Sequence, residues 1–219
     1  MAGTQGALPL LSRSCLSLVL LLGSATPLSA KQLSKKEGDP YPEITLRVYD
    51  YAGLQAELLS RALGLTKTIF ADAGVVVVPI ICTEHKSPET CNEPLAPLKV
   101  VLRIVPRPAP GAEYEILGYA SGSYIIVNYS GVKEIVDHSQ AFLDKILGCV
   151  IAHELGHVLL GPDSHSSMGI MTAGLTDWEL RPTRTLFVGF LPFQKARIRA
   201  YVFSQTRGKP VGNIVLAQR

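Results

Sequence analysis

The sequence predicts a single α/β domain in which one mixed sheet packs against two main helices and a C-terminal helix. Three observations lead to this fold class. Segments with strand and helix periodicity follow one another in the order strand, helix, strands, helix, helix, which is typical of a layered α/β domain. The 219 residues contain no internal repeat and no second domain boundary. The composition, 47% hydrophobic and 18% charged, excludes a disordered chain.

Four apolar segments are predicted to supply the sheet. Residues 44–49 (ITLRVY) alternate between apolar and polar side chains, as a half-buried strand does. Residues 75–82 (VVVVPIIC) form a continuous apolar run, which is typical of a buried strand. Residues 98–105 (LKVVLRIV) alternate again, and residues 118–129 (GYASGSYIIVNY) supply one or two further strands.

Three segments are predicted to be helical. Residues 55–73 carry apolar side chains near helical spacing and end before Gly74, a residue suited to a helix C-terminus. A long helix is expected over about 139–160, because the sequence Gly-Pro that follows it stops a helix. Residues 192–204 form the last helix, with proline at its first position.

The first thirty residues have the pattern of a secretory signal peptide. Arg13 is their only charge, residues 15–22 (CLSLVLLL) are uniformly apolar, and small residues lead up to Ala30. The apolar run is too short to span a bilayer as a stable helix, although an uncleaved N-terminal anchor is the alternative. We expect cleavage after Ala30 rather than after Ala25. The apolar signal segment accounts for much of the chain's high mean hydropathy of +0.24.

This processing divides the chain into three parts. Residues 1–30 are the signal peptide, residues 31–42 (KQLSKKEGDPYP) a flexible leader, and residues 43–219 the folded domain. We therefore expect a secreted or periplasmic protein with no stable membrane insertion after cleavage. The formal net charge is only +3 and no stretch gathers lysine and arginine. This balance argues against nucleic acid as a partner, and we expect a monomer.

Three of the four cysteines remain in the exported chain. Cys82 and Cys91 bracket a polar loop (TEHKSPET) and could form a short disulfide in an oxidising compartment. Cys149 lies in an apolar helical segment, where a buried thiol is the favoured interpretation.

The long helix carries the sequence His153-Glu154-Leu-Gly-His157. Two histidines four positions apart lie on the same face of a helix, and their imidazoles can bind one zinc ion. Glu154 lies about 100° further round the helix, where it can flank a metal-bound water as general base. Two ligands and a base at this spacing form the HExxH pattern of zinc metallopeptidases. The apolar residues around the motif favour a metal site, since buried histidines need partners.

From this motif onward the chain resembles the metzincin metallopeptidases, whose motif HExxHxxGxxH is followed by a methionine turn beneath the metal. The sequence here is HELGHVLLGPDSHSSMGIM. It departs from the pattern because the glycine, Gly161, comes one residue late and because Asp163 stands at the third-ligand position. The resemblance covers about residues 150–172 and implies a zincin-like fold. It also implies that Met171 is the methionine of the turn.

The third zinc ligand has two main candidates. Asp163 stands at the third-ligand position when the motif is aligned without a gap. In this respect the sequence resembles the snapalysins, which use an aspartate at that position. His165 requires a longer loop, but the segment resembles secreted bacterial proteins with HELGHLLLG, SHS and GIM, where this histidine would be the ligand. We favour His165, because imidazole suits zinc well. A carboxylate from Asp177 or Glu179, as in thermolysin-like enzymes, is a remote alternative.

These features predict a secreted Zn²⁺-dependent endopeptidase that acts on peptide or protein substrates, with His153, His157 and His165 as zinc ligands and Glu154 as catalytic base. The resemblance implies that residues 118–129 form the edge along which an extended substrate pairs. One alternative is a zinc-dependent amidase acting on cell-envelope material. Another is a non-catalytic zinc-holding module, which predicts a closed site with Asp163 and His165 both bound.

Overall fold

A computed structural model describes residues 41–83, 88–107, 117–139, 142–173 and 189–206. All helices and strands in these ranges belong to one compact unit, Pro40–Arg219. The predicted signal peptide, residues 1–30, lies outside the described residues, as does most of the predicted leader. Within the described residues, no helix combines the length and the hydropathy that crossing a membrane requires.

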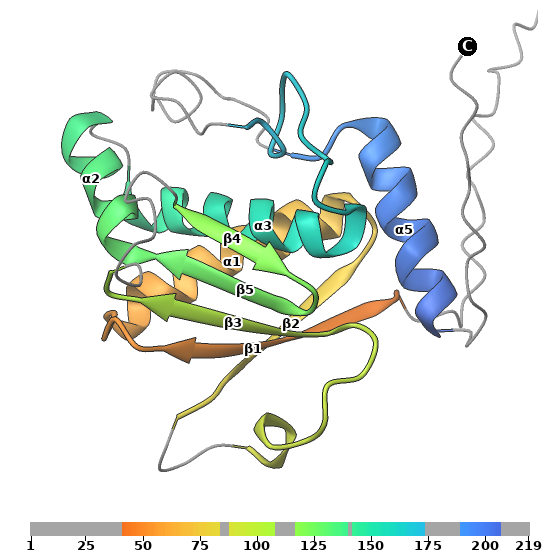
Figure 1. Ribbon diagram of the computed structural model, residues 1–219, viewed down its shortest axis with the longest axis horizontal. Coiled ribbons are helices and arrows are strands. Elements are labelled where there is room, and N and C mark those ends of the chain that lie inside the picture. The colour runs from red at the N-terminus through yellow and green to blue at the C-terminus, as the bar shows by residue number, and fades with distance from the viewer. Residues whose placement is uncertain (1–40, 84–87, 108–116, 140–141, 174–188, 207–219) are drawn as a thin grey trace, which may run out of the picture. The chain divides into compact units, whose positions relative to one another are not determined.

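Five strands form one mixed sheet (Figure 1). Its order is β2-β1-β3-β5-β4, in which β4 alone runs antiparallel to its neighbour. The strands are β1 (Glu43–Asp50), β2 (Val76–Ile81), β3 (Lys99–Val105), β4 (Gly118–Ser121) and β5 (Tyr124–Asn128). Every predicted strand segment is present, and residues 118–129 supply the last two strands as a hairpin. The predicted α/β class is confirmed.

Two long helices cover one face of this sheet, behind it in Figure 1. They are α1 (Ala56–Asp72) and α3 (Leu143–Leu160), which pack against each other. Ile44, Leu46 and Val48 on β1 are fully buried beneath them, because alternate residues of a strand face the same side. The C-terminal helix α5 (Pro192–Thr206) packs against α3 and begins with proline, as predicted.

Helix α2 (Tyr129–Ser139) was not predicted from the sequence. The long helix was expected to begin near Ser139, but it begins at Leu143, and a separate helix precedes it. The Asn128 side chain accepts hydrogen bonds from the Ser130 hydroxyl, at 2.8 Å, and from the Gly131 amide, at 3.4 Å. Asparagine is a preferred residue for starting a helix in this way, and this signal follows directly on β5.

The predicted disulfide between Cys82 and Cys91 is confirmed. Cys91 belongs to residues 88–98, which we call the covering segment. This segment contacts the sheet face opposite α1 and α3: Arg47 Nη1 donates to the Glu93 carbonyl at 2.7 Å, and the Tyr49 hydroxyl donates to the Cys91 carbonyl at 3.1 Å. Cys149 is a buried thiol outside the disulfide, as expected.

Candidate metal centre

Helix α3 supplies two of the histidines. Nearly all of its residues from Ile146 onward are buried, which explains why the sequence reads as an apolar run without a clear polar face. His153 and His157 share the side of the helix that faces a cavity. The helix ends where Gly161 takes a φ of 98°, a conformation that glycine adopts at little cost. The chain then turns back over the histidines as residues 161–173, which we call the site loop.

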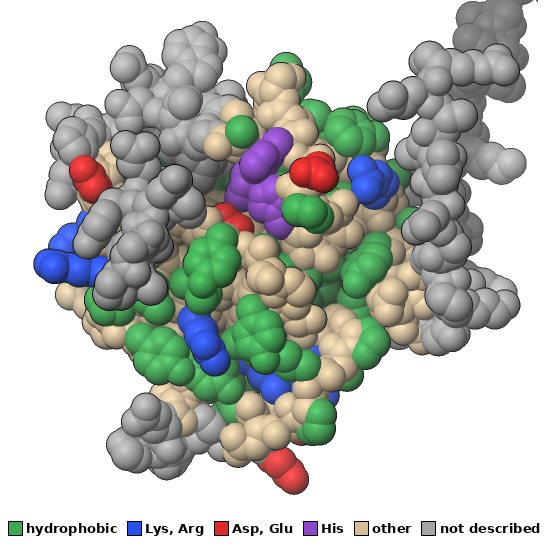
Figure 2. All heavy atoms as spheres, in the orientation of Figure 1, with side chains coloured by type: hydrophobic (Ala, Val, Ile, Leu, Met, Phe, Trp, Pro, Cys, Tyr) green, Lys and Arg blue, Asp and Glu red, His purple; other side chains and the backbone are tan. Residues whose placement is uncertain are grey.

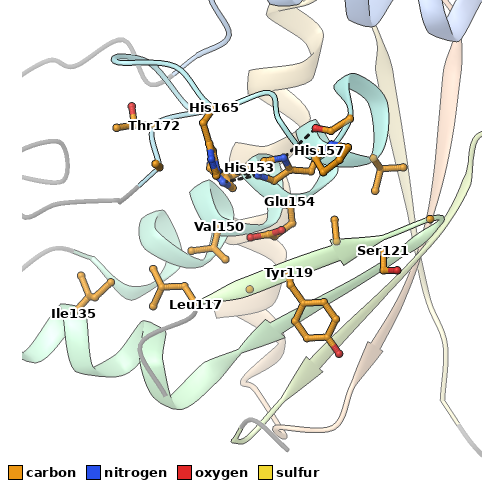
Figure 3. A pocket seen from close by; sticks show the side chains of 17 residues that line it. Leu117, Tyr119, Ser121, Ile135, Val150, His153, Glu154, His157, His165 and Thr172 are labelled. Carbon is orange, nitrogen blue, oxygen red and sulfur yellow. Dashed lines mark hydrogen bonds between the residues drawn. The ribbon is translucent and has the colours of Figure 1, made fainter. Parts of the chain in front are cut away.

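The three histidine rings converge at one point (Figure 3). His157 Nε2 lies 3.0 Å from His153 Nε2 and 3.1 Å from His165 Nε2. Figure 2 shows these rings gathered at the surface. Among the described residues, this is the one group of three or more histidine, cysteine or acidic side chains with ligand atoms close enough for a metal ion. The group joins α3 to the site loop.

The outer nitrogens of the two helical histidines fix where their protons lie. His153 Nδ1 lies 2.8 Å from the Ile170 carbonyl, and His157 Nδ1 lies 3.2 Å from the Gly161 carbonyl. A carbonyl only accepts, so both Nδ1 atoms must donate. In the neutral rings the facing Nε2 atoms then carry lone pairs, which repel at 3.0 Å unless a cation lies between them.

This arrangement fits a Zn²⁺ ion. Three nitrogens about 2.0–2.1 Å from a tetrahedral zinc lie roughly 3.3 Å from one another, close to the separations of His157 Nε2 from the other two. Burial lowers the pKa of His153 from its ordinary value to about 4, and burial also lowers the pKa of His157. Both rings are therefore neutral near pH 7, which is the form that binds a metal.

The two candidates for the third ligand lie in different surroundings. The His165 ring points at the two helical histidines, whereas Asp163 is exposed and does not belong to the cluster. The site loop is thus long enough to bring the later residue over α3. The remote candidates, Asp177 and Glu179, lie outside the described residues.

Glu154 lies beside the histidines and below them in Figure 3. Its side chain is only 6% exposed, and burial raises the pKa of its carboxyl group to about 7, because a low-dielectric environment penalises the charged form. It packs against Gly118 of β4. A methyl group on Gly118 would lie 2.9 Å from Glu154 Cγ and 3.0 Å from the Ile126 carbonyl oxygen, so only glycine leaves room for this carboxylate.

Met171, in the site loop, is completely buried. It packs against Gly156, between the two helical histidines in sequence: a Cβ atom there would lie 2.4 Å from Met171 Sδ. The neighbouring residue in the loop, Ile170, accepts a hydrogen bond from His153 through its carbonyl oxygen. The methionine therefore seats the loop against the helix just where the loop meets the first histidine.

The cluster opens into a cavity of about 860 Å³ between α3, β4 and the site loop. One wall is apolar and is formed by Leu117, Ile135 and Val150. The edge strand β4 forms another wall (Figure 3). Sequence reasoning identified the histidines and Glu154 but missed Ile135, because it did not detect α2, which carries this residue.

No protein-family model and no curated protein sequence matches the chain. Solved structures do. One is an archaemetzincin from Methanopyrus kandleri, 14% identical, with a TM-score of 0.49 over 75% of this chain and 98% of that one. Another is a zinc-dependent peptidase from Methanocorpusculum labreanum, 12% identical, with a TM-score of 0.46 over 70% of this chain and 99% of that one. Neither likeness assigns a role to any residue of this chain.

Proposed function

We propose that this chain is a zinc-dependent endopeptidase. The observation that carries the proposal is the convergence of three imidazole nitrogens beside a buried carboxylate at the mouth of a cavity. His153, His157 and His165 hold the metal, and Met171 supports them from below. A zinc ion in such a site supplies a Lewis acid that activates water and polarises a carbonyl group.

Glu154 is the general base in this proposal. It accepts a proton from the water that attacks the peptide carbonyl carbon, and it delivers that proton to the nitrogen of the departing amine as the C–N bond breaks. Its position supports both roles, because the carboxylate lies against β4 and faces the cavity. A pKa near 7 suits a group that must take up and release a proton in each turnover.

The substrate in this proposal is an extended peptide. Strand β4 is the last strand in the sheet order and pairs with β5 on one side, while the cavity lies along it. An extended chain can add to such an edge through backbone hydrogen bonds, largely independently of sequence. The backbone of β4 thereby holds the scissile bond near Glu154.

Export of the protein is part of the same proposal. The Cys82–Cys91 disulfide supports it, because such bonds persist in oxidising compartments outside the cytosol. The pattern of residues 1–30 points to the same route. We therefore place the enzyme outside the cytosol, secreted or periplasmic, and we expect it to act as a monomer.

Replacing Glu154 by glutamine tests the proposal. The variant keeps the size of the side chain and removes the base, so zinc content should stay near one ion per chain. Hydrolysis of casein should fall by a factor of about 10²–10⁴, the usual contribution of a general base. Glu57→Gln, at an exposed position on α1, is the matched control and should behave as wild type.

Two outcomes would contradict the proposal. Glu154→Gln enzyme with the wild-type rate would remove the carboxylate from the mechanism. Wild-type protein that cleaves cell-envelope fragments but leaves casein and other peptides intact would point instead to an amidase that uses the same zinc site.

A further inference from the structure

The third histidine is held differently from the other two. His153 and His157 are fixed by helix α3, whereas His165 lies in the site loop, where the backbone forms local hydrogen bonds, such as that from Ser166 N to the Met171 carbonyl at 2.8 Å, but no regular helix or strand. The His165 side chain is exposed. Beyond these local bonds, contacts from elsewhere in the fold hold the loop on either side of this residue.

Gln194 on α5 provides such contacts. Its side chain is polar yet only 1% exposed. Its Nε2 atom donates to Ser166 Oγ at 3.1 Å and to the Ser164 carbonyl oxygen at 3.4 Å. These two residues immediately precede and follow His165 in sequence. The single amide group of Gln194 therefore holds the backbone on both sides of this histidine.

The orientation of this amide group is fixed. The Leu191 backbone N–H can only donate, and it donates to Gln194 Oε1 at 2.9 Å. The NH₂ end must therefore face the site loop. All three contacts are satisfied together only by a side chain that carries an acceptor and two donors, as glutamine does.

The contacts of Gln194 also reach a second histidine. Ser164, whose carbonyl oxygen accepts from Gln194, donates through its hydroxyl to the Gly161 carbonyl at 2.7 Å. The same hydroxyl lies 3.1 Å from His157 Nδ1. Gln194 thus links α5 to the surroundings of both His157 and His165.

We propose that Gln194 is a positioning residue for zinc binding. It holds Ser164 and Ser166 so that the His165 ring meets the rings of α3. This inference rests on the proposed zinc site and goes beyond it, because Gln194 itself touches neither the metal nor the substrate. Groups that orient metal ligands commonly change metal affinity by a factor of 10–100 when removed.

Zinc affinity and the melting temperature of the metal-free protein together test the proposal. Gln194→Met keeps the volume and removes the hydrogen bonds. It should raise the zinc Kd, measured by competition with a chelator, by about 10- to 100-fold. Arg199→Met is the matched control, since it removes one hydrogen bond from the same helix to the Ala73 carbonyl. It should lower the melting temperature of the metal-free protein and leave the zinc Kd within about twofold.

Ser166→Ala removes the loop's acceptor for the Gln194 hydrogen bond and leaves α5 unchanged. It tests the same contact if Gln194→Met does not fold. The variant loses the hydrogen bond from Gln194 and also the one that the Ser166 hydroxyl donates to the Met168 carbonyl at 2.9 Å. Loss of one neutral hydrogen bond is worth about 0.5–1.5 kcal/mol, so the zinc Kd should rise by at least about 2-fold.

The outcomes separate the two proposals. A Gln194→Met protein with the wild-type zinc Kd would overturn the positioning role, while zinc binding by the wild type would leave the proposed site intact. A wild-type protein that binds no zinc, or a His157→Ala variant with unchanged zinc content, would overturn the proposed function and this inference with it.

Discussion

Two irregular segments of this protein are held in place by different means. The covering segment, residues 88–98, is tied by the Cys82–Cys91 disulfide and by single hydrogen bonds from β1. The site loop, residues 161–173, contains no cysteine. It is held by a set of hydrogen bonds to α3 and α5 and by the packing of Met171 against Gly156.

The difference follows from what each segment must do. A disulfide restricts how far the chain can move but leaves the orientation of most groups open. In the described part of the chain, the buried side-chain atoms without a hydrogen bond are Arg47 Nε, Arg47 Nη2 and Thr90 Oγ1, all in or under the covering segment. The proposed role of His165 as a metal ligand instead requires its ring to be held within about 0.5 Å and 10–20°, and several hydrogen bonds can provide this.

The largest expected effect concerns the choice of ligand in the site loop. His165→Ala should raise the zinc Kd by more than about 100-fold, because it removes a ligand rather than a group that orients one. Asp163→Ala should leave zinc content and peptide hydrolysis near wild type, since Asp163 is exposed and lies outside the cluster. Metal analysis after dialysis against a weak chelator measures both variants. The opposite pattern would make Asp163 the ligand.

Removing the disulfide should have a smaller effect, and one on stability alone. The double variant Cys82→Ser, Cys91→Ser should lose about 2–3 kcal/mol of unfolding free energy, as expected for a loop of about ten residues. Its zinc Kd at 25 °C should equal that of the wild type, because no ligand contacts the covering segment. Urea unfolding of the metal-free protein gives the first quantity. A large loss of zinc affinity in this variant would show that the two segments are coupled.

The smallest expected effect is a change in pH dependence that arises from the site. The pKa of His153, lowered to about 4, makes the metal-free fold less stable as the pH falls below about 6.5, since only the unfolded chain then binds this proton. The pKa of Glu154, raised to about 7, acts in the opposite direction: its contribution is complete below about 4.5 and is lost as the pH rises through 7.

Between pH 4.5 and 6.5 these two contributions oppose each other, so together they add little slope to the stability of the wild type. Glu154→Gln should leave the His153 contribution alone and lose about 1 kcal/mol per pH unit on acidification relative to wild type. Urea unfolding of both metal-free proteins at pH 5.0 and 6.5 measures this difference. Equal slopes would mean that Glu154 does not titrate in this range.

The parts of the fold that the sequence predicted are those encoded over short distances. Alternation along 44–49 and 98–105 predicted β1 and β3, and the four-residue spacing of His153 and His157 predicted two rings on one helix face. Helix α2 was missed because a single residue, Asn128, marks the change from strand to helix.

The third ligand could be narrowed only to two residues, because no periodicity governs a loop such as 161–173. The contribution of Gln194 had no local signal at all. It lies 28 residues beyond Ser166 in sequence and meets it only because α5 packs on α3. Long-range polar contacts of this kind depend on the assembled fold.

The spacing of the three histidines also affects how zinc and folding are coupled. His153 and His165 are twelve positions apart, so closing the chain between them costs little conformational entropy even before the sheet forms. The unfolded ensemble can therefore bind zinc as well, which reduces the stabilisation that the ion gives to the native state. Zinc should consequently raise the melting temperature by less than its native-state affinity implies.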